Sequence, residues 1–195
     1  MNYTPKPIVK EYIWGVETWI YSDDNILIKL IDAKQNLSVQ VHPNDEQAAP
    51  ERGKTEMWYI IEALPNAEII YGFNRKITRE EFRERIEKGT LLEVVNRIKV
   101  KKGDVFFVPA GTIHAIGAGI LIAEVQQNSD ITYRVYDYGR VDPNGNPREL
   151  HIEKAIQVTD LNPPIQPYNR TSCEYFDFKR LNIDGVNAFN IKGAE

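Results

Sequence analysis

Residues 103–114 read Gly-Asp-Val-Phe-Phe-Val-Pro-Ala-Gly-Thr-Ile-His, and this stretch does most to decide the fold. It predicts a Gly-Asp turn, a buried apolar strand over 105–108, a Pro-Ala-Gly turn and a histidine at the start of the next strand. Gly111 allows a close chain reversal because glycine adopts a positive φ at no steric cost. His114 is thereby held on rigid sheet. A lone histidine more often just ends a core strand, so its meaning depends on its partners.

A second histidine ends an alternating segment, Leu37–His42. Period-two geometry sends Ser38, Gln40 and His42 to one face of a strand and the apolar residues between them to the other. Burying two ligand-capable side chains on one face is costly unless something satisfies them, and a metal ion would do so. A solvent-facing strand is the alternative.

A carboxylate precedes the third strand, where residues 54–61 read Lys-Thr-Glu-Met-Trp-Tyr-Ile-Ile. The same alternation puts Lys54 and Glu56 on one face. Glu56 by itself suits an ordinary surface carboxylate. Joined to Gln40, His42 and His114, it completes a set of two imidazoles, one carboxylate and one amide. That set suits a borderline divalent ion such as zinc, with one ion per chain.

Four motifs, in the same order along the chain, resemble a known enzyme family. They are Gln40-Val41-His42-Pro43, Lys54-Thr55-Glu56, Pro109-Ala110-Gly111-Thr112-Ile113-His114-Ala115, and Ser129-Asp130 followed by Arg134. The third resembles the second motif of the cupin barrels, although Ala118 stands where cupins carry a later asparagine. Together the motifs resemble the class I mannose-6-phosphate isomerases, over roughly residues 5–165.

The resemblance implies a mainly β fold, a cupin (jelly-roll) barrel, and an aldose-ketose isomerase acting on a small sugar phosphate. The reaction would be the metal-dependent interconversion of mannose 6-phosphate and fructose 6-phosphate. It implies that the metal ligands are Gln40, His42, Glu56 and His114, and that the active-site arginine is Arg134. Asp130 and a basic residue at Arg140 also match the family's pattern.

The chemistry of an aldose-ketose isomerase explains these residue types. Moving a proton between neighbouring carbons develops negative charge on enediolate oxygens, which a metal ion stabilises as a Lewis acid. Arg134 adds a permanently charged, fork-shaped donor. The proton carrier is open between a water on the metal, Asp130, Lys54 and a ring nitrogen. For the substrate phosphate, Arg140 and Lys54 are the candidate binding residues.

Composition excludes several other classes of protein. The net charge of −4 over 195 residues argues against a nucleic-acid surface. The single cysteine, Cys173, forms no internal disulfide, which fits a reducing compartment. No signal-peptide core and no membrane-spanning apolar run are recognisable, so a cytoplasmic protein without membrane contact is expected. The oligomeric state is left open.

Strand signals dominate the chain and two helical segments interrupt them. Thr78-Arg79-Glu80-Glu81 forms a capping box that predicts a helix ending at Gly89, within a small helical insertion around 78–96. A second short helix is expected around His151–Val158, where His151 is more plausibly structural than catalytic. The strands are expected at Ile26–Ile31, Leu37–His42, Met57–Glu62, Glu68–Tyr71, Val105–Val108, Ile120–Gln126 and Thr132–Tyr136.

The organisation expected is a metal-binding catalytic cupin domain over 1–161, followed by a different segment over 162–195. Residues 162–167 read Asn-Pro-Pro-Ile-Gln-Pro, which is too proline-rich for helix or inner strand and predicts a linker. The alternating run over 174–183 then predicts the first strand of a second β segment. Short bacterial members of the family continue into a second β domain, so this chain is expected to be either a truncated form or a divergent one-barrel version that lacks most of that domain.

Two other classes of function stay open at this stage. One is an iron-dependent cupin oxygenase, for which two histidines and a carboxylate suffice. Gln40, Lys54 and Arg134 argue against it, because oxygenase sites need open positions more than fixed cations. The other is a catalytically silent cupin that binds a sugar phosphate, which the missing C-terminal domain makes plausible.

Overall fold

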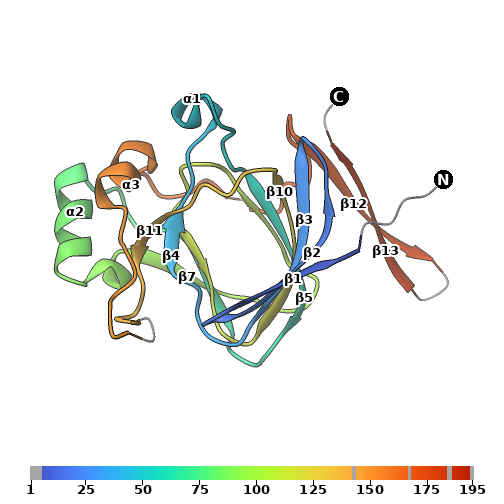
Figure 1. Ribbon diagram of the computed structural model, residues 1–195, viewed down its shortest axis with the longest axis horizontal. Helices are drawn as coiled ribbons and strands as arrows, with labels where there is room; N and C mark the ends of the chain where they lie inside the picture. Colours follow the sequence, from blue (N-terminus) through green and yellow to red (C-terminus); the bar gives the residue numbers. More distant parts are fainter. Residues whose placement is uncertain (1–5, 142–143, 167, 184–185, 194–195) are drawn as a thin grey trace.

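A computed structural model describes residues 6–141, 144–166, 168–183 and 186–193, and two sheets facing each other form its body. The six-stranded sheet has the order β1-β2-β3-β10-β5-β8, and the five-stranded sheet has the order β11-β4-β9-β6-β7. Seen along its shortest axis, the molecule shows the two sheets as opposite walls of a barrel (Figure 1).

The strands of the six-stranded sheet are β1 Ile8–Tyr12, β2 Gly15–Ser22, β3 Ile26–Ala33, β5 Glu56–Ala63, β8 Val105–Val108 and β10 Ile120–Gln127. The strands of the five-stranded sheet are β4 Val39–Val41, β6 Glu68–Phe73, β7 Val95–Lys99, β9 His114–Ile116 and β11 Tyr133–Tyr136. All their pairings are antiparallel. This arrangement confirms the expected mainly β barrel of cupin type.

The barrel interior changes from apolar to polar along the strands. On β5 the inner face carries Trp58 and Ile60 in the core between the sheets, while alternate residues face outward. On β10 the inward set runs from Ile122 to Glu124 and Gln126, all buried. One end of the barrel is thus a packed core, and the other presents buried polar side chains.

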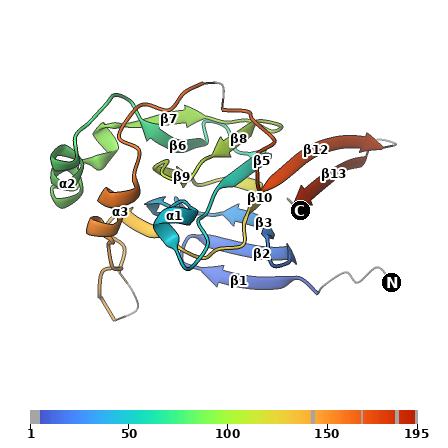
Figure 2. The ribbon, with the colours of Figure 1, turned by 90° about the horizontal axis from the view of Figure 1, so that it is seen from above.

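Helices cover the outer face of the five-stranded sheet, as Figures 1 and 2 show for α2 Arg79–Glu87 and α3 Ile152–Val158. Phe82 of α2 and Ile156 of α3 pack in one cluster with the outward side chains of β4. The Thr78 side chain accepts a hydrogen bond from the Glu81 amide at 3.1 Å, as the capping motif predicts. The short helix α1 Asp45–Ala48 was not predicted, whereas the 3-10 turn η1 Leu91–Glu93 lies inside the helical insertion expected around 78–96. None of the helices within the described ranges is long and apolar enough to cross a membrane.

A hairpin of β12 Phe176–Ile183 and β13 Val186–Gly193 follows the proline-rich segment and projects beside the barrel (Figure 2). Phe176 and Phe178 are buried against the outer face of the six-stranded sheet. The strand expected over 174–183 is therefore present and pairs with β13. The division into a catalytic domain over 1–161 and a separate segment over 162–195 stays a prediction.

Candidate metal centre and active-site cavity

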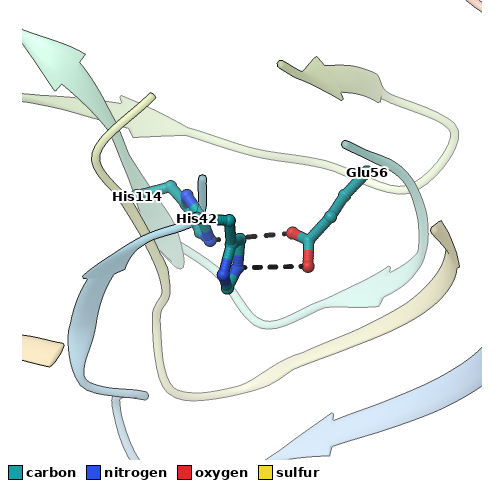
Figure 3. A group of neighbouring side chains, drawn as sticks. All are labelled: His42, Glu56 and His114. Carbon is teal, nitrogen blue, oxygen red and sulfur yellow. Dashed lines mark ion pairs between the residues drawn. The ribbon is translucent and has the colours of Figure 1, made fainter. Parts of the chain in front are cut away.

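Three buried side chains converge at the polar end of the barrel: His42, Glu56 and His114 (Figure 3). Their potential ligand atoms lie within 4.8 Å of one another. The His42 Nε2 atom is 3.3 Å from one Glu56 carboxylate oxygen, and the His114 Nε2 atom is 3.6 Å from the other. Each of the three side chains is only 1% exposed, so the cluster is closed to bulk water.

Sheet register brings these residues together from distant parts of the chain. His114 opens β9, and its Cα pairs with that of Gln40 in the middle of β4. His42 lies one residue beyond the end of β4, which is shorter than the expected strand over Leu37–His42. Glu56 begins β5 in the facing sheet. The cluster thus spans both walls of the barrel.

Backbone carbonyls fix the protonation of both imidazoles. The Nδ1 atoms of His42 and His114 lie 2.7 Å from the Ile131 carbonyl and 2.8 Å from the Thr112 carbonyl, respectively. A carbonyl accepts only, so each Nδ1 carries the proton and each Nε2 keeps a lone pair directed at the cluster. This carbonyl support is typical of metal-binding histidines.

The Glu56 carboxylate lacks the hydrogen bonds that a buried carboxylate needs. Lys54 Nζ lies 2.8 Å from one oxygen as an ion pair, yet neither oxygen has a well-aligned donor among the described residues. Burial by itself raises the pKa of Glu56, but the Lys54 ammonium and the imidazoles hold that pKa well below its usual value. An ionised carboxylate facing two imidazole lone pairs fits a divalent cation.

Gln40 stands at the edge of the same cluster. Its amide Nε2 donates to His114 Nε2 over 3.4 Å, a long contact. Rotation of the amide group would present its oxygen in place of its nitrogen, because the two ends are nearly identical in shape. The side chain can therefore serve as a fourth donor to an ion held by His42, Glu56 and His114.

Stability of the metal-free protein is expected to fall as the pH drops below about 6.5, the usual histidine pKa. Burial, followed by the Lys54 charge, lowers the pKa of His42 to about 3, and burial lowers the pKa of His114. The unfolded chain therefore binds more protons in this range. For each histidine that stays neutral in the folded state, the free energy of unfolding falls by about 1.4 kcal/mol per unit decrease in pH. Urea unfolding at pH 7 and pH 5 measures the loss. His42→Gln should reduce the pH dependence, and equal stability of the parent protein at both values would contradict the assignment.

A cavity of about 250 Å³ opens above the cluster. Of the candidate catalytic, phosphate-binding and ligand residues, five line it: Gln40, Lys54, His114, Asp130 and Arg134. His42 and Glu56 lie beneath this lining. Arg140 does not line the cavity; it lies in a separate surface depression beside Tyr138.

Arg140 has its donors engaged elsewhere. Its Nη1 donates to the Asn36 carbonyl at 2.7 Å, its Nε to the Asp137 carbonyl at 3.2 Å, and its Nη2 to the Asp137 carboxylate. The side chain is only 11% exposed. This arrangement leaves it little capacity to bind a substrate phosphate.

The cavity also contains a buried ion pair that sequence reasoning missed, between Lys29 and Glu124. Their Cα atoms are register partners on β3 and β10, and Lys29 Nζ lies 2.9 Å from Glu124. The other Glu124 oxygen accepts from the Trp58 indole at 2.8 Å. Burial, and then the charge of Glu56, raise the pKa of Glu124. The available signal was a single charge inside an apolar run, Lys29 within residues 26–31 and Glu124 within residues 120–125.

Arg134 is half-buried on the opposite wall of the cavity. Its Nη1 donates to the Glu149 carbonyl at 2.9 Å, while its buried Nε has no hydrogen-bond partner among the described residues. Arg148, which the sequence did not single out, lines the same cavity. The cavity therefore combines a potential metal centre, the buried ion pair of Lys29 and Glu124, and two guanidinium groups.

The comparisons with known proteins agree with this geometry. No family model matches the chain. The chain is 49% identical over 179 residues to the mannose-6-phosphate isomerase ManA of Bacillus subtilis, which covers 82% of this chain and 56% of that protein. The crystal structure of the mannose 6-phosphate isomerase from Bacillus subtilis matches with a TM-score of 0.79 at 34% identity, over 93% of this chain and 73% of that one. This chain belongs to the mannose-6-phosphate isomerase family.

Other members of the mannose-6-phosphate isomerase family are also similar. The enzyme of Streptococcus mutans is 51% identical over 142 residues, which cover 71% of this chain and 45% of that protein. A putative mannosephosphate isomerase from Archaeoglobus fulgidus shares the fold, with a TM-score of 0.71 at 18% identity. The chain spans about half the length of the curated relatives it matches. The names of these relatives do not favour the oxygenase or silent-cupin alternatives.

Proposed function

We propose that this chain is a metal-dependent isomerase that interconverts mannose 6-phosphate and fructose 6-phosphate. The observation that carries the proposal is the convergence of the His42 and His114 lone pairs on the Glu56 carboxylate, whose oxygens lack aligned donors. The cavity above this cluster is lined by Arg134, which suits an anionic intermediate. A cytoplasmic location accords with the single cysteine.

Zinc is the proposed ion, held by Gln40, His42, Glu56 and His114. Two neutral imidazoles, one carboxylate and one amide oxygen are donors that zinc accepts, and the ion would retain a net positive charge. When bound, it would supply Lewis-acid stabilisation of the developing enediolate charge.

The side chains of the cavity supply the remaining chemistry. Arg134 would stabilise the enediolate oxygens with a fixed positive charge, and Lys54 would add a second cation at the ligand cluster. The Nδ1 hydrogen bonds of both histidines argue against a ring nitrogen as the proton carrier. Asp130 lines the cavity and stays the proposed carrier; Glu124, with its raised pKa, is the carboxylate to compare with it.

Replacing Asp130 with asparagine is expected to lower kcat by about 10²- to 10⁴-fold, the usual loss on removing a general acid or base. Zinc content should stay at one ion per chain, because Asp130 lies outside the ligand cluster. The measurement is kcat for mannose 6-phosphate beside metal analysis. Asp160→Asn, at an exposed position outside the cavity, serves as the matched control. Near-normal kcat in Asp130→Asn would pass the role to Glu124 or Lys54.

The proposal is tested by incubating the zinc-loaded chain with mannose 6-phosphate in D₂O and following products by NMR. Because Asp130 is exposed, a proton that it carries should exchange with solvent, so fructose 6-phosphate should appear and carry deuterium at C1. Stoichiometric zinc and sugar-phosphate binding without any product would indicate a silent binding protein. Product without deuterium would show that the transferred hydrogen does not exchange with solvent, as in a hydride shift or a shielded proton transfer, while leaving the isomerase activity intact.

A further inference from the structure

We infer that Arg148 binds the substrate's phosphate group, leaving Arg134 beside it to face the reacting carbons. This inference rests on the proposed function, since it names the residue that would select a phosphorylated sugar. It differs from the expectation drawn from the sequence, which gave this role to Arg140 and Lys54.

Arg148 is available to a ligand. It lines the cavity, its side chain is 26% exposed, and its nearest carboxylate contact is a loose 3.6 Å from Nη1 to Asp137. That Asp137 oxygen already accepts from Arg140. A planar guanidinium with donors to spare matches the geometry of a phosphate group.

The other cations of the cavity are already engaged. Lys29 is paired with Glu124 at 2.9 Å and Lys54 with Glu56 at 2.8 Å, both deep in the barrel. Lys10 lies over the Trp19 ring, 3.4 Å from its centroid. Among the described residues, the cavity cations with neither an ion pair closer than 3.6 Å nor a contact to an aromatic ring are therefore Arg134 and Arg148, which form one wall.

The two guanidinium groups are held near each other by the backbone. The Arg134 amide donates to His151 Nδ1 at 3.1 Å, and the His151 amide donates to the Arg134 carbonyl at 2.7 Å. These bonds fix the segment before α3, which carries Arg148, against β11. Both guanidinium groups line the same cavity, and like charges that share a site repel each other. A phosphate dianion would remove this repulsion.

Sheet register separates the roles of the two arginines. The Cα of Arg134 pairs with that of Gln40, so Arg134 stands next to the ligand cluster. Arg148 lies outside the strands, on the segment that returns to the barrel at His151. In a hexose 6-phosphate, the carbons that exchange a proton and the phosphate lie at opposite ends of the molecule. Arg148, which lies outside the strands, is therefore placed to bind the phosphate while Arg134 faces the reacting carbons.

The test compares Arg148→Ala and Arg148→Lys with the parent chain, all zinc-loaded and checked for folding by circular dichroism. Calorimetric titration with inorganic phosphate gives Kd, and initial rates give KM and kcat for mannose 6-phosphate. Arg148→Ala should weaken phosphate binding and raise KM by about 10- to 100-fold, the usual effect of losing a charged hydrogen bond. The Kd and KM of Arg148→Lys should lie between those of Arg148→Ala and of the parent chain. In both variants kcat and zinc content should be almost unchanged. Arg83→Ala, on the outer helix α2, is the surface control.

Two competing variants complete the design, Arg140→Ala and Lys10→Ala. Unchanged phosphate Kd and KM in Arg148→Ala would overturn the inference, and so would a loss confined to either competing variant. The proposed function fails separately: a parent chain that binds phosphate through Arg148 yet forms no fructose 6-phosphate keeps the phosphate site and loses the isomerase.

Discussion

Replacing His114 with alanine is expected to abolish both stoichiometric zinc binding and isomerase turnover while the barrel stays folded. His114 offers one of two neutral nitrogen donors, with its lone pair fixed by the Thr112 carbonyl. Losing even a supporting residue around a metal costs about 10- to 100-fold in affinity, so a direct ligand should cost at least as much. The apolar core at the other end of the barrel is untouched, so the variant should retain its β-rich circular dichroism spectrum.

Metal analysis after dialysis against low zinc, beside kcat, measures this loss. The chain has only three histidines, so His151→Ala is a matched control for zinc content, which it should leave at one ion per chain. His114→Ala with a full complement of zinc and near-normal turnover would show that His114 is not a ligand.

Replacing Arg134 with alanine is expected to lower kcat by about 10²- to 10³-fold, the usual cost of one donor to an oxyanion in a closed site. The reason is that Arg134 would act on charge that appears mainly in the transition state. Arg134→Lys keeps the charge and loses the planar fork, so it should remain badly impaired. Zinc content should be unchanged in both variants, because a guanidinium does not bind the cation.

A structural role for Arg134 predicts a different outcome. The hydrogen bond from Arg134 to the Glu149 carbonyl would then contribute on the order of 1 kcal/mol to stability and nothing to catalysis. Arg134→Ala would then show a slightly lower unfolding free energy and a normal kcat. That pair of results would remove Arg134 from the mechanism.

The fold class could be predicted from the sequence because the deciding segment combines strong local signals. Residues 105–108 form β8 as expected, and the helix after Thr78 starts at its predicted cap. Strands β1 and β2, which pair at the cavity mouth, were not predicted. They are partly exposed, and their sequences lack a clear alternation of apolar and polar residues. Strand β9 starts at His114, as the Pro-Ala-Gly turn before it predicted.

Spacing along the chain predicted only part of the candidate site. Alternation alone places Lys54 beside Glu56, and the two are in fact 2.8 Å apart. The pair Lys29 and Glu124 depends on the register of strands 95 residues apart in the chain, which no local pattern reveals. Arg148 lies in a polar segment whose position depends on the His151 hydrogen bonds. Long-range pairing also brings His42, Glu56 and His114 together, and their common role as ligands was implied by the resemblance to a known family.

Zinc titration of the metal-free chain tests the central claim most directly. Fructose 6-phosphate formation from mannose 6-phosphate is measured after each addition of zinc to protein stripped by a chelator. We predict that activity rises linearly and stops rising at one zinc per chain. Turnover that is already complete without metal, or absent at full zinc occupancy, would contradict the account.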